Sequence, residues 1–168
     1  RLQHAGGTVT VEGGLTNADQ ANLLSLKSNI NRVDIPGLFK AFDNFGQDAI
    51  TAGNMKGKLS AKAKLELVLN DKAEIKGNSM KGAIDFSVKN GELINFEPLV
   101  KITTTALKNR DFSHITFAEL QNRFSVNGSA FYIPKMEIRS NVVVLFVEGI
   151  YDTKKGTDMS IQVPVRKK

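Results

Sequence analysis

The chain has 168 residues, a formal net charge of +6 at pH 7 and 41% hydrophobic residues. Its length is that of one domain, which buries about two thirds of the surface that the unfolded chain exposes. It contains no cysteine, which excludes disulfides, thiolate metal sites and cysteine nucleophiles and is compatible with an oxidising compartment. No apolar run approaches the roughly 18 residues of a membrane-spanning helix.

The first part of the sequence predicts a β-hairpin followed by a helix. Apolar residues alternate over residues 8–12 and 23–30, as in two paired strands. Ile35-Pro36 then begins a helix, because proline in a first turn loses no hydrogen bond that it would have made there. The apolar side of this helix consists of Leu38, Phe39, Phe42 and Phe45.

The clearest strand follows over residues 56–69, where odd positions are apolar and even positions are mostly polar. At about 3.3 Å per residue this strand would span roughly 50 Å, so we expect it to bend or to carry a bulge. Residues 80–88 continue the alternation in a neighbouring strand, after which Asn90-Gly91 is expected to turn the chain. Residues 96–107 show apolar residues at helical spacing, which predicts a second helix packed on the sheet.

Residues 115–165 are typical of an antiparallel meander of four strands. The Asn-Gly dipeptide at 127–128 tolerates the positive φ angles of a tight hairpin turn. A polar break at 140–141 separates the next two strands. Residues 142–147 are apolar at every position, so we expect both faces of that strand to be buried.

About eight strands, two helices and no alternating βαβ rhythm predict a mainly antiparallel α+β fold. We expect a curved meander sheet, shaped as a groove or half-barrel, that two helices cover. The chain is interpreted as a single domain over 1–168, with the first hairpin and helix in 1–52 and the main sheet with its covering helix in 53–168. Both ends are expected to be cut from a longer protein, because each lies beside a predicted strand.

The sequence contains no recognisable catalytic or metal-binding pattern. His4 and His114 lie far apart, and neither has an evident partner. We expect His4 in a frayed terminus, and we interpret His114 as a loop or packing residue and not as a catalytic base. There is no G-x-S-x-G elbow and no H-E-x-x-H helix, and the glycine pairs near the start flank a strand instead of opening a helix. We therefore predict no enzyme, no catalytic residue, no metal and no cofactor.

The positive charge is spread over the polar positions of strands. Such spacing favours a solvated strand face over a nucleic-acid surface, and the phenylalanines alternate inward, as core residues do. We expect no nucleic-acid partner. Anionic phospholipid headgroups attract surface lysines by about 1 kcal/mol each. The candidate headgroup contacts are Lys56, Lys58, Lys62 and Lys64.

An ordered set of strand and turn motifs resembles the C-terminal region of the AsmA family, over residues 35–165. The segment NMKGKLSA at 54–61 is similar to a family strand, and NGELINFEPL at 90–99 is similar to a strand-to-helix junction of the family. Together with IPKMEIRS at 133–140 and the strand pattern of 116–152, these segments most resemble AsmA-like proteins of Bacteroidota.

The resemblance implies a function. Proteins of this family look like bridge-like lipid-transfer proteins, in which a curved sheet with a hydrophobic concave face conducts phospholipid between the inner and outer membranes. It implies a periplasmic location, an inner-membrane anchor that precedes this chain, a role in outer-membrane biogenesis, and phospholipid or another lipid and envelope proteins as partners. It supplies no catalytic residues. The lipid-groove candidates carried over to this sequence are Leu59, Ala61, Leu65, Leu67, Ile84, Phe86, Phe124, Val126 and Ile138.

Two further interpretations stay open. The apolar strand faces could form an ordinary closed core, in a structural or interaction domain whose sheet edges stack on the rest of a larger membrane-anchored protein. An unrecognised hydrolase is the third. Phospholipid that copurifies with the protein would distinguish the first interpretation from the second.

Overall fold

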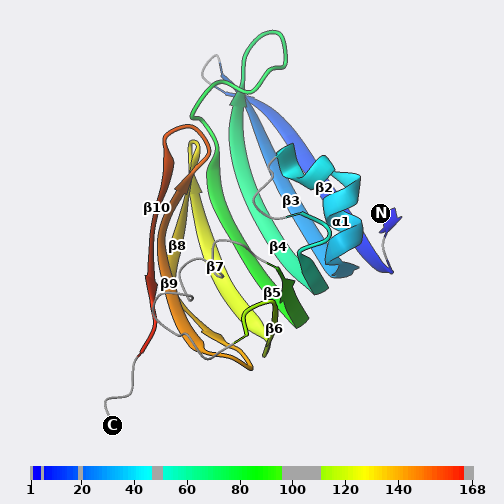
Figure 1. The fold of residues 1–168 in the computed structure, drawn as a ribbon. Coiled ribbons are helices and arrows are strands. Elements are labelled where there is room, and N and C mark those ends of the chain that lie inside the picture. The colour runs from blue at the N-terminus through cyan, green and yellow to red at the C-terminus, as the bar shows by residue number, and fades with distance from the viewer. Residues whose placement is uncertain (1, 5, 19–20, 47–50, 96–110, 165–168) are drawn as a thin grey trace.

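The computed structural model describes residues 2–4, 6–18, 21–46, 51–95 and 111–164. Within them, ten strands form one antiparallel sheet in the order β1-β2-β3-β4-β5-β7-β8-β9-β10, with β6 also paired to β5 (Figure 1). The strands are β1 (Leu2–His4), β2 (Gly7–Ala18), β3 (Ala21–Asp34), β4 (Met55–Leu69), β5 (Lys81–Ile94), β6 (His114–Phe117), β7 (Leu120–Asn127), β8 (Ala130–Arg139), β9 (Val144–Asp152) and β10 (Gly156–Gln162).

The open, curved, mainly antiparallel sheet confirms the expected class, and the number of elements differs. The described residues form ten strands instead of about eight, because β1 and β6 are short strands that sequence alternation does not reveal. They contain one α-helix, α1 (Ile35–Ala41), followed by a short 3-10 helix, η1 (Asp43–Gly46). The second predicted helix, over 96–107, lies outside the described residues. The β2–β3 hairpin pairs with β4, so it belongs to the same sheet.

Helix α1 begins where the sequence predicts and ends earlier than its apolar side suggests. The Asp34 carboxylate accepts a hydrogen bond from the Gly37 amide at 3.4 Å, which caps the first turn, and Pro36 follows the cap. Asp43 and Asn44 have positive φ angles of 47° and 51°, which an α-helix cannot accommodate. The α-helix therefore ends before Asp43, and the chain continues as the short 3-10 helix η1, which includes Gly46.

Strand β4 is the predicted long strand, and it carries the expected bulge. Its 15 residues pair with β3 on one side and β5 on the other, with a register shift against β5 between Lys56 and Lys58. The extra residue in β5 comes from Asn90-Gly91, where Asn90 has a φ of 53°. The prediction that this dipeptide turns the chain is wrong, because the positive φ serves a bulge and β5 continues to Ile94.

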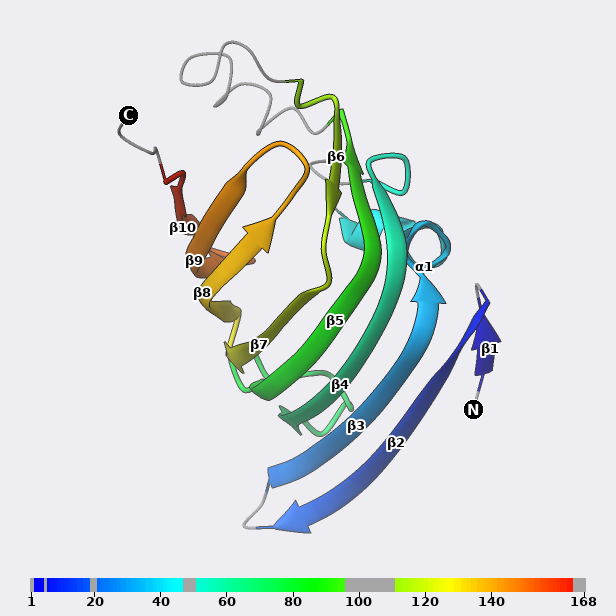
Figure 2. The ribbon, with the colours of Figure 1, turned by 90° about the horizontal axis from the view of Figure 1, so that it is seen from below.

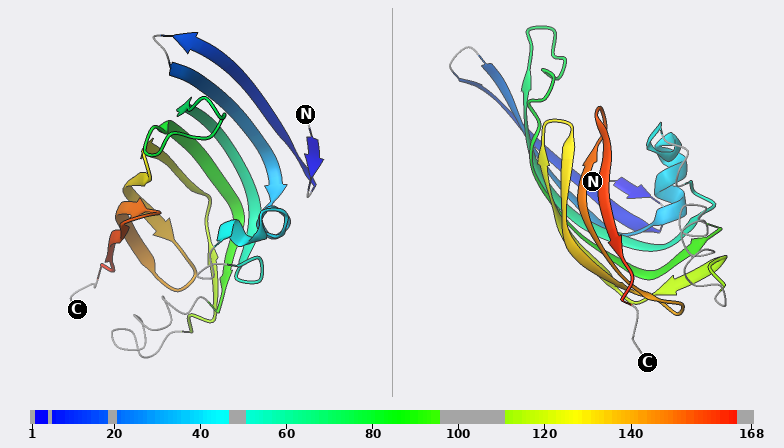
Figure 3. Two further views of the ribbon diagram at one scale, coloured as in Figure 1. Left: turned by 90° about the horizontal axis from the view of Figure 1, so that it is seen from above. Right: turned by 60° about the vertical axis from the view of Figure 1, so that its left-hand side comes forward.

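The strands bow along their length, as the right-hand view of Figure 3 shows. Gly82 and Gly149 lie in strand interiors with φ angles of 153° and 145°. A Cβ atom at Gly82 would overlap the backbone of Lys64, and one at Gly149 would overlap the backbone of Asp158. Missing side chains at these positions let neighbouring strands approach closely, which favours the bend.

The C-terminal meander follows the predicted turns. Gly128 has a φ of 64° in the tight turn between β7 and β8, and the chain breaks again before β9. The expectation that both faces of residues 142–147 are buried is only partly met. Leu145 is buried on one face, whereas Phe146 on the other is half-buried, with the Lys135 ammonium 4.9 Å from its ring centroid. A cation–π contact thus replaces part of the apolar cover.

A compact core forms at the end of the sheet where β6 lies. The turn between β8 and β9 folds back onto β6, which it joins through a bridge between Phe117 and Ser140. The buried residues of this core cluster are Phe112, Ile115, Val143 and Leu145, with Ile138 and Leu93 among those packed against it. A second buried group, Val33 with Ile35 and Leu38, lies where α1 meets the sheet.

Candidate functional site

The concave side of the sheet is its apolar side. Helix α1 lies in the hollow of the curved sheet, near the ends of β3 and β4 (Figures 2 and 3). Val33, at the junction of β3 with α1, is fully buried, and its partner in the register is Leu59 of β4. Odd residues of β4 therefore face inward, and its even residues, mostly lysines, face the convex side.

The strand registers place all nine predicted groove residues on this concave face. Leu59 is paired with Val88, Ala61 with Phe86, and Ile84 with Phe124. Leu67 and Val126 are buried, each with 4% of its surface exposed. Ile138 is half-buried against the core cluster. The other candidates are half-buried along the middle of the sheet: Leu59, Ala61, Leu65, Ile84, Phe86 and Phe124.

Two aromatic rings lie at the centre of this surface. The centroids of Phe86 and Phe124 are 4.7 Å apart, with an angle of 57° between the ring planes. Such tilted pairs are favourable beyond the area that they bury. Both side chains are half-buried, so they form an apolar floor that is still accessible to solvent.

The apolar surface also extends beyond the predicted residues. On β3, Leu24 and Leu26 face the same side as Leu67 and Leu65, their register partners. On β2, Val11 and Leu15 continue the row and are 60% and 64% exposed. Alternation within residues 22–30 could have revealed the β3 positions. The β2 positions were missed because glycines interrupt the pattern between them.

The four candidate headgroup lysines lie on the opposite, convex face and do not act as one set. Lys56 forms an ion pair with Glu92 at 3.1 Å, and Lys58 forms one with Asp34 at 3.2 Å. Lys62 and Lys64 are exposed and belong to none of the ion pairs within the described residues. These lysines therefore point away from the apolar surface.

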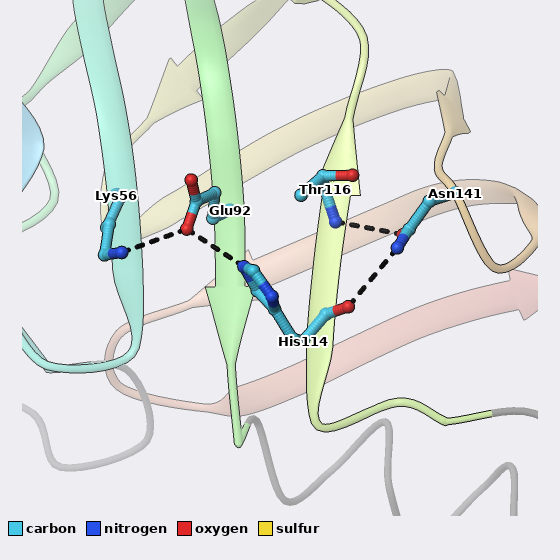
Figure 4. Close-up of polar contacts among 5 residues, drawn as sticks. All are labelled: Lys56, Glu92, His114, Thr116 and Asn141. Atoms are coloured by element: carbon cyan, nitrogen blue, oxygen red, sulfur yellow. Dashed lines mark hydrogen bonds and ion pairs between the residues drawn. The ribbon is translucent and has the colours of Figure 1, made fainter.

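His114 has a partner, contrary to the expectation from the sequence. It lies in β6, and its Nε2 atom is 3.0 Å from the Glu92 Oε2 atom of β5, which also binds Lys56 of β4 (Figure 4). Asn141 accepts a hydrogen bond from the Thr116 amide at 3.0 Å, and donates one to the His114 carbonyl at 3.4 Å. This polar network joins three strands to the turn between β8 and β9.

The network also sets the ionisation of Glu92. The hydrogen bond from His114, followed by that from Lys56, lowers the pKa of the Glu92 carboxyl below its usual value. Lys56 and His114 both bind the half-buried Glu92 carboxylate, and both of these basic side chains are exposed. We interpret this network as structural.

Within the described ranges, no group of three or more histidine, aspartate or glutamate side chains is arranged to hold a metal ion. None of the helices in that part of the chain is long and apolar enough to cross a membrane. Comparisons of the sequence and structure with protein-family models, curated proteins and solved structures gave no match.

Proposed function

We propose that this chain is a non-enzymatic periplasmic module in outer-membrane biogenesis. In this proposal, the concave face holds or conducts phospholipid acyl chains along a hydrophobic β-groove between the inner and outer membranes, within a longer protein anchored in the inner membrane. The resemblance to AsmA-like proteins supplies the cellular setting.

The observation that carries the proposal is the partial exposure of a continuous apolar surface. It runs from Leu15 on β2 through Leu65 and Phe124 in the middle of the sheet to Ile161 on β10. In the described part of the chain, a short helix covers one corner of it and the core cluster fills one end. A soluble domain rarely leaves so long a surface to water.

Acyl chains suit this surface chemically. Burial of each CH₂ group contributes roughly 0.8 kcal/mol and requires no directed polar partner. The face supplies branched aliphatic and phenylalanine side chains in rows along neighbouring strands, and its polar residues, such as Asn122 beside Phe86, are few. A chain could therefore slide along it with little change in contact energy.

A second candidate function is that of a structural domain that joins other strands through its edges. The β2 edge beyond its short pairing with β1 contains one charged residue, Glu12, and two exposed apolar residues. Sheet edges that stay unpaired usually carry several charges, a proline or a bulge. This edge therefore favours an incoming strand from the rest of a longer protein.

The test is to place a photo-crosslinking amino acid at Phe86 or Leu65 in the native-length protein and to identify what it captures in cells. Lys62, on the convex face of the same strand as Leu65, is the matched control position. Lipid adducts at the two concave positions and none at Lys62 support the groove. Capture of protein alone at all positions, together with no copurified lipid in native mass spectrometry, supports the structural domain instead.

A blocking variant tests transport itself. Leu65→Glu combined with Phe86→Arg places charges on the half-buried lining, so entry of an acyl chain costs desolvation. We expect impaired outer-membrane integrity at normal protein level. The control pair Gln121→Glu with Ser125→Arg places the same two charges on exposed convex positions of β7 and should leave the barrier intact. An equal defect in both double variants would contradict the lipid path.

A further inference from the structure

The convex face carries a separate feature, a shallow hollow of about 550 Å³ over β3, β4, β5 and β7. Its charged lining consists of Lys27, Lys64, Lys81, Arg123 and Glu66. Because Arg123 is paired with Asp85, three lysines share the hollow with one carboxylate, which leaves a surplus of positive charge there. The hollow is on the opposite side of the sheet from the apolar surface.

Two of the lysines oppose each other directly. Lys27 of β3 and Lys64 of β4 are register partners, so their side chains leave the sheet side by side. Like charges that face each other across strands are destabilising. Neither lysine forms an ion pair with a described residue.

A second cross-strand lysine pair in the same sheet shows how such repulsion is normally relieved. Lys58 and Lys89 are register partners between β4 and β5. Lys58 binds Asp34 at 3.2 Å and Lys89 binds Glu119 at 3.5 Å, so each charge has its own carboxylate. Neither Lys27 nor Lys64 has such a carboxylate partner among the described residues.

Nearby carboxylates are engaged elsewhere. Asp85 accepts both of its 3.2 Å hydrogen bonds from Arg123, on the far side of β5 from β3. Glu66 is the register partner of Lys81 and forms no ion pair with Lys27 or Lys64 among the described residues. The charges of Lys27 and Lys64 are therefore left without an internal counterpart at the centre of the hollow.

We propose that this hollow binds a phosphate-class oxyanion between Lys27 and Lys64. Lys81 lines the same hollow and adds positive charge and further N–H donors, and Arg123, which is paired with Asp85, lies beside it. The same chemistry is offered by free inorganic phosphate and by the phosphate of a lipid headgroup. This site is independent of the lipid groove, since it uses other side chains on the other face.

The first experiment compares thermal unfolding in sodium phosphate and in sodium chloride at equal ionic strength. In chloride, Lys64→Gln should raise the Tm, because it removes the like-charge contact. In phosphate, the wild type should gain more than the variant, with an apparent phosphate affinity about tenfold higher. General salting-out by phosphate acts on both proteins and cancels in the difference.

Lys89→Gln is the matched control, because it alters the lysine pair that already has carboxylate partners. It should keep the wild-type response to phosphate. The proposal is overturned if Lys64→Gln has an unchanged or lower Tm in chloride, or if it responds to phosphate as the wild type does.

A second experiment distinguishes the two sources of the phosphate. The protein is sedimented with phosphatidylcholine vesicles that contain phosphatidic acid, and with pure phosphatidylcholine vesicles. Binding to the acidic vesicles alone, lost in Lys64→Gln and displaced by inorganic phosphate, assigns the site to a lipid headgroup. A phosphate-specific Tm shift with no vesicle binding assigns it to a soluble phosphate. Vesicle binding that Lys64→Gln retains counts against the site.

Discussion

The core cluster at the β6 end and the middle of the concave face carry equally apolar side chains, yet they are buried to different extents. Ile115 and Leu145 are 4% and 5% exposed, because the turn between β8 and β9 folds back over β6. Leu65 and Ile84 lie on the same face of the same sheet and stay half-buried. Alternation therefore determines on which face of the sheet a residue lies. Whether that residue is buried depends on a second chain segment that covers it.

The largest expected effect separates these two regions directly. Leu145→Ala should lower the free energy of unfolding by about 3 kcal/mol, because it leaves a cavity in a packed cluster. Leu65→Ala should lower it by only about 1 kcal/mol, because the side chain is half-buried and water can fill the space. Urea denaturation of both variants provides the measurement. Equal losses would mean that the middle of the face is as well packed as the cluster.

The next effect tests what shapes the open region. Gly82→Ala should cost about 2 kcal/mol, because its Cβ would meet the backbone of Lys64 and its φ of 153° suits glycine. Gly14→Ala on β2 is the control, because no atom outside its chain neighbours lies within 4 Å of the added Cβ. The control should stay within about 0.5 kcal/mol of the wild type. Similar stabilities for the two variants would contradict a role of Gly82 in the bend.

A smaller effect measures order within the open region. A double-mutant cycle of Phe86→Leu and Phe124→Leu should give a coupling of about 1 kcal/mol, since the two rings pack at 4.7 Å. The cycle of Phe86→Leu with Leu145→Ala, which joins the open and closed regions, should be additive within about 0.5 kcal/mol. Additivity in the first cycle would indicate that the rings do not hold each other in solution.

The smallest effect concerns the polar network on the convex side of the closed end. Because the folded-state pKa of Glu92 is lowered, its carboxylate stabilises the fold fully above the ordinary value of 4.5. This contribution is lost as the pH falls from there through the lower folded pKa. Glu92→Gln should therefore be less stable than the wild type at neutral pH, and the difference should shrink in acid.

Unfolding curves from pH 3 to pH 7 check this prediction, with Glu66→Gln as a control for removal of one negative charge from the same face. Glu66 takes part in none of the ion pairs within the described part of the chain, so its removal breaks no contact between strands of this kind. A gap between Glu92→Gln and the wild type that widens in acid would show that the network around His114 does not form.

Much of the fold follows from local patterns in the sequence. The odd–even alternation of 55–69 specifies a long strand with a defined inner face, and the proline after Ile35 marks the start of α1. The inner face of the candidate groove could therefore be assigned residue by residue. Asn90-Gly91 shows the limit of such patterns, because the same dipeptide and the same positive φ serve either a hairpin turn or a bulge.

The sequence by itself determined the long strands, their inner and outer faces and the apolar character of the inner face, because period-two alternation is a local property of the chain. Only the tertiary structure decided which apolar residues are covered, that His114 meets Glu92, and that Lys27 opposes Lys64. Each of these depends on pairing or cover between segments that are distant in sequence. Strand register and chain reversal set such contacts, and the residue types at the individual positions do not reveal either of them.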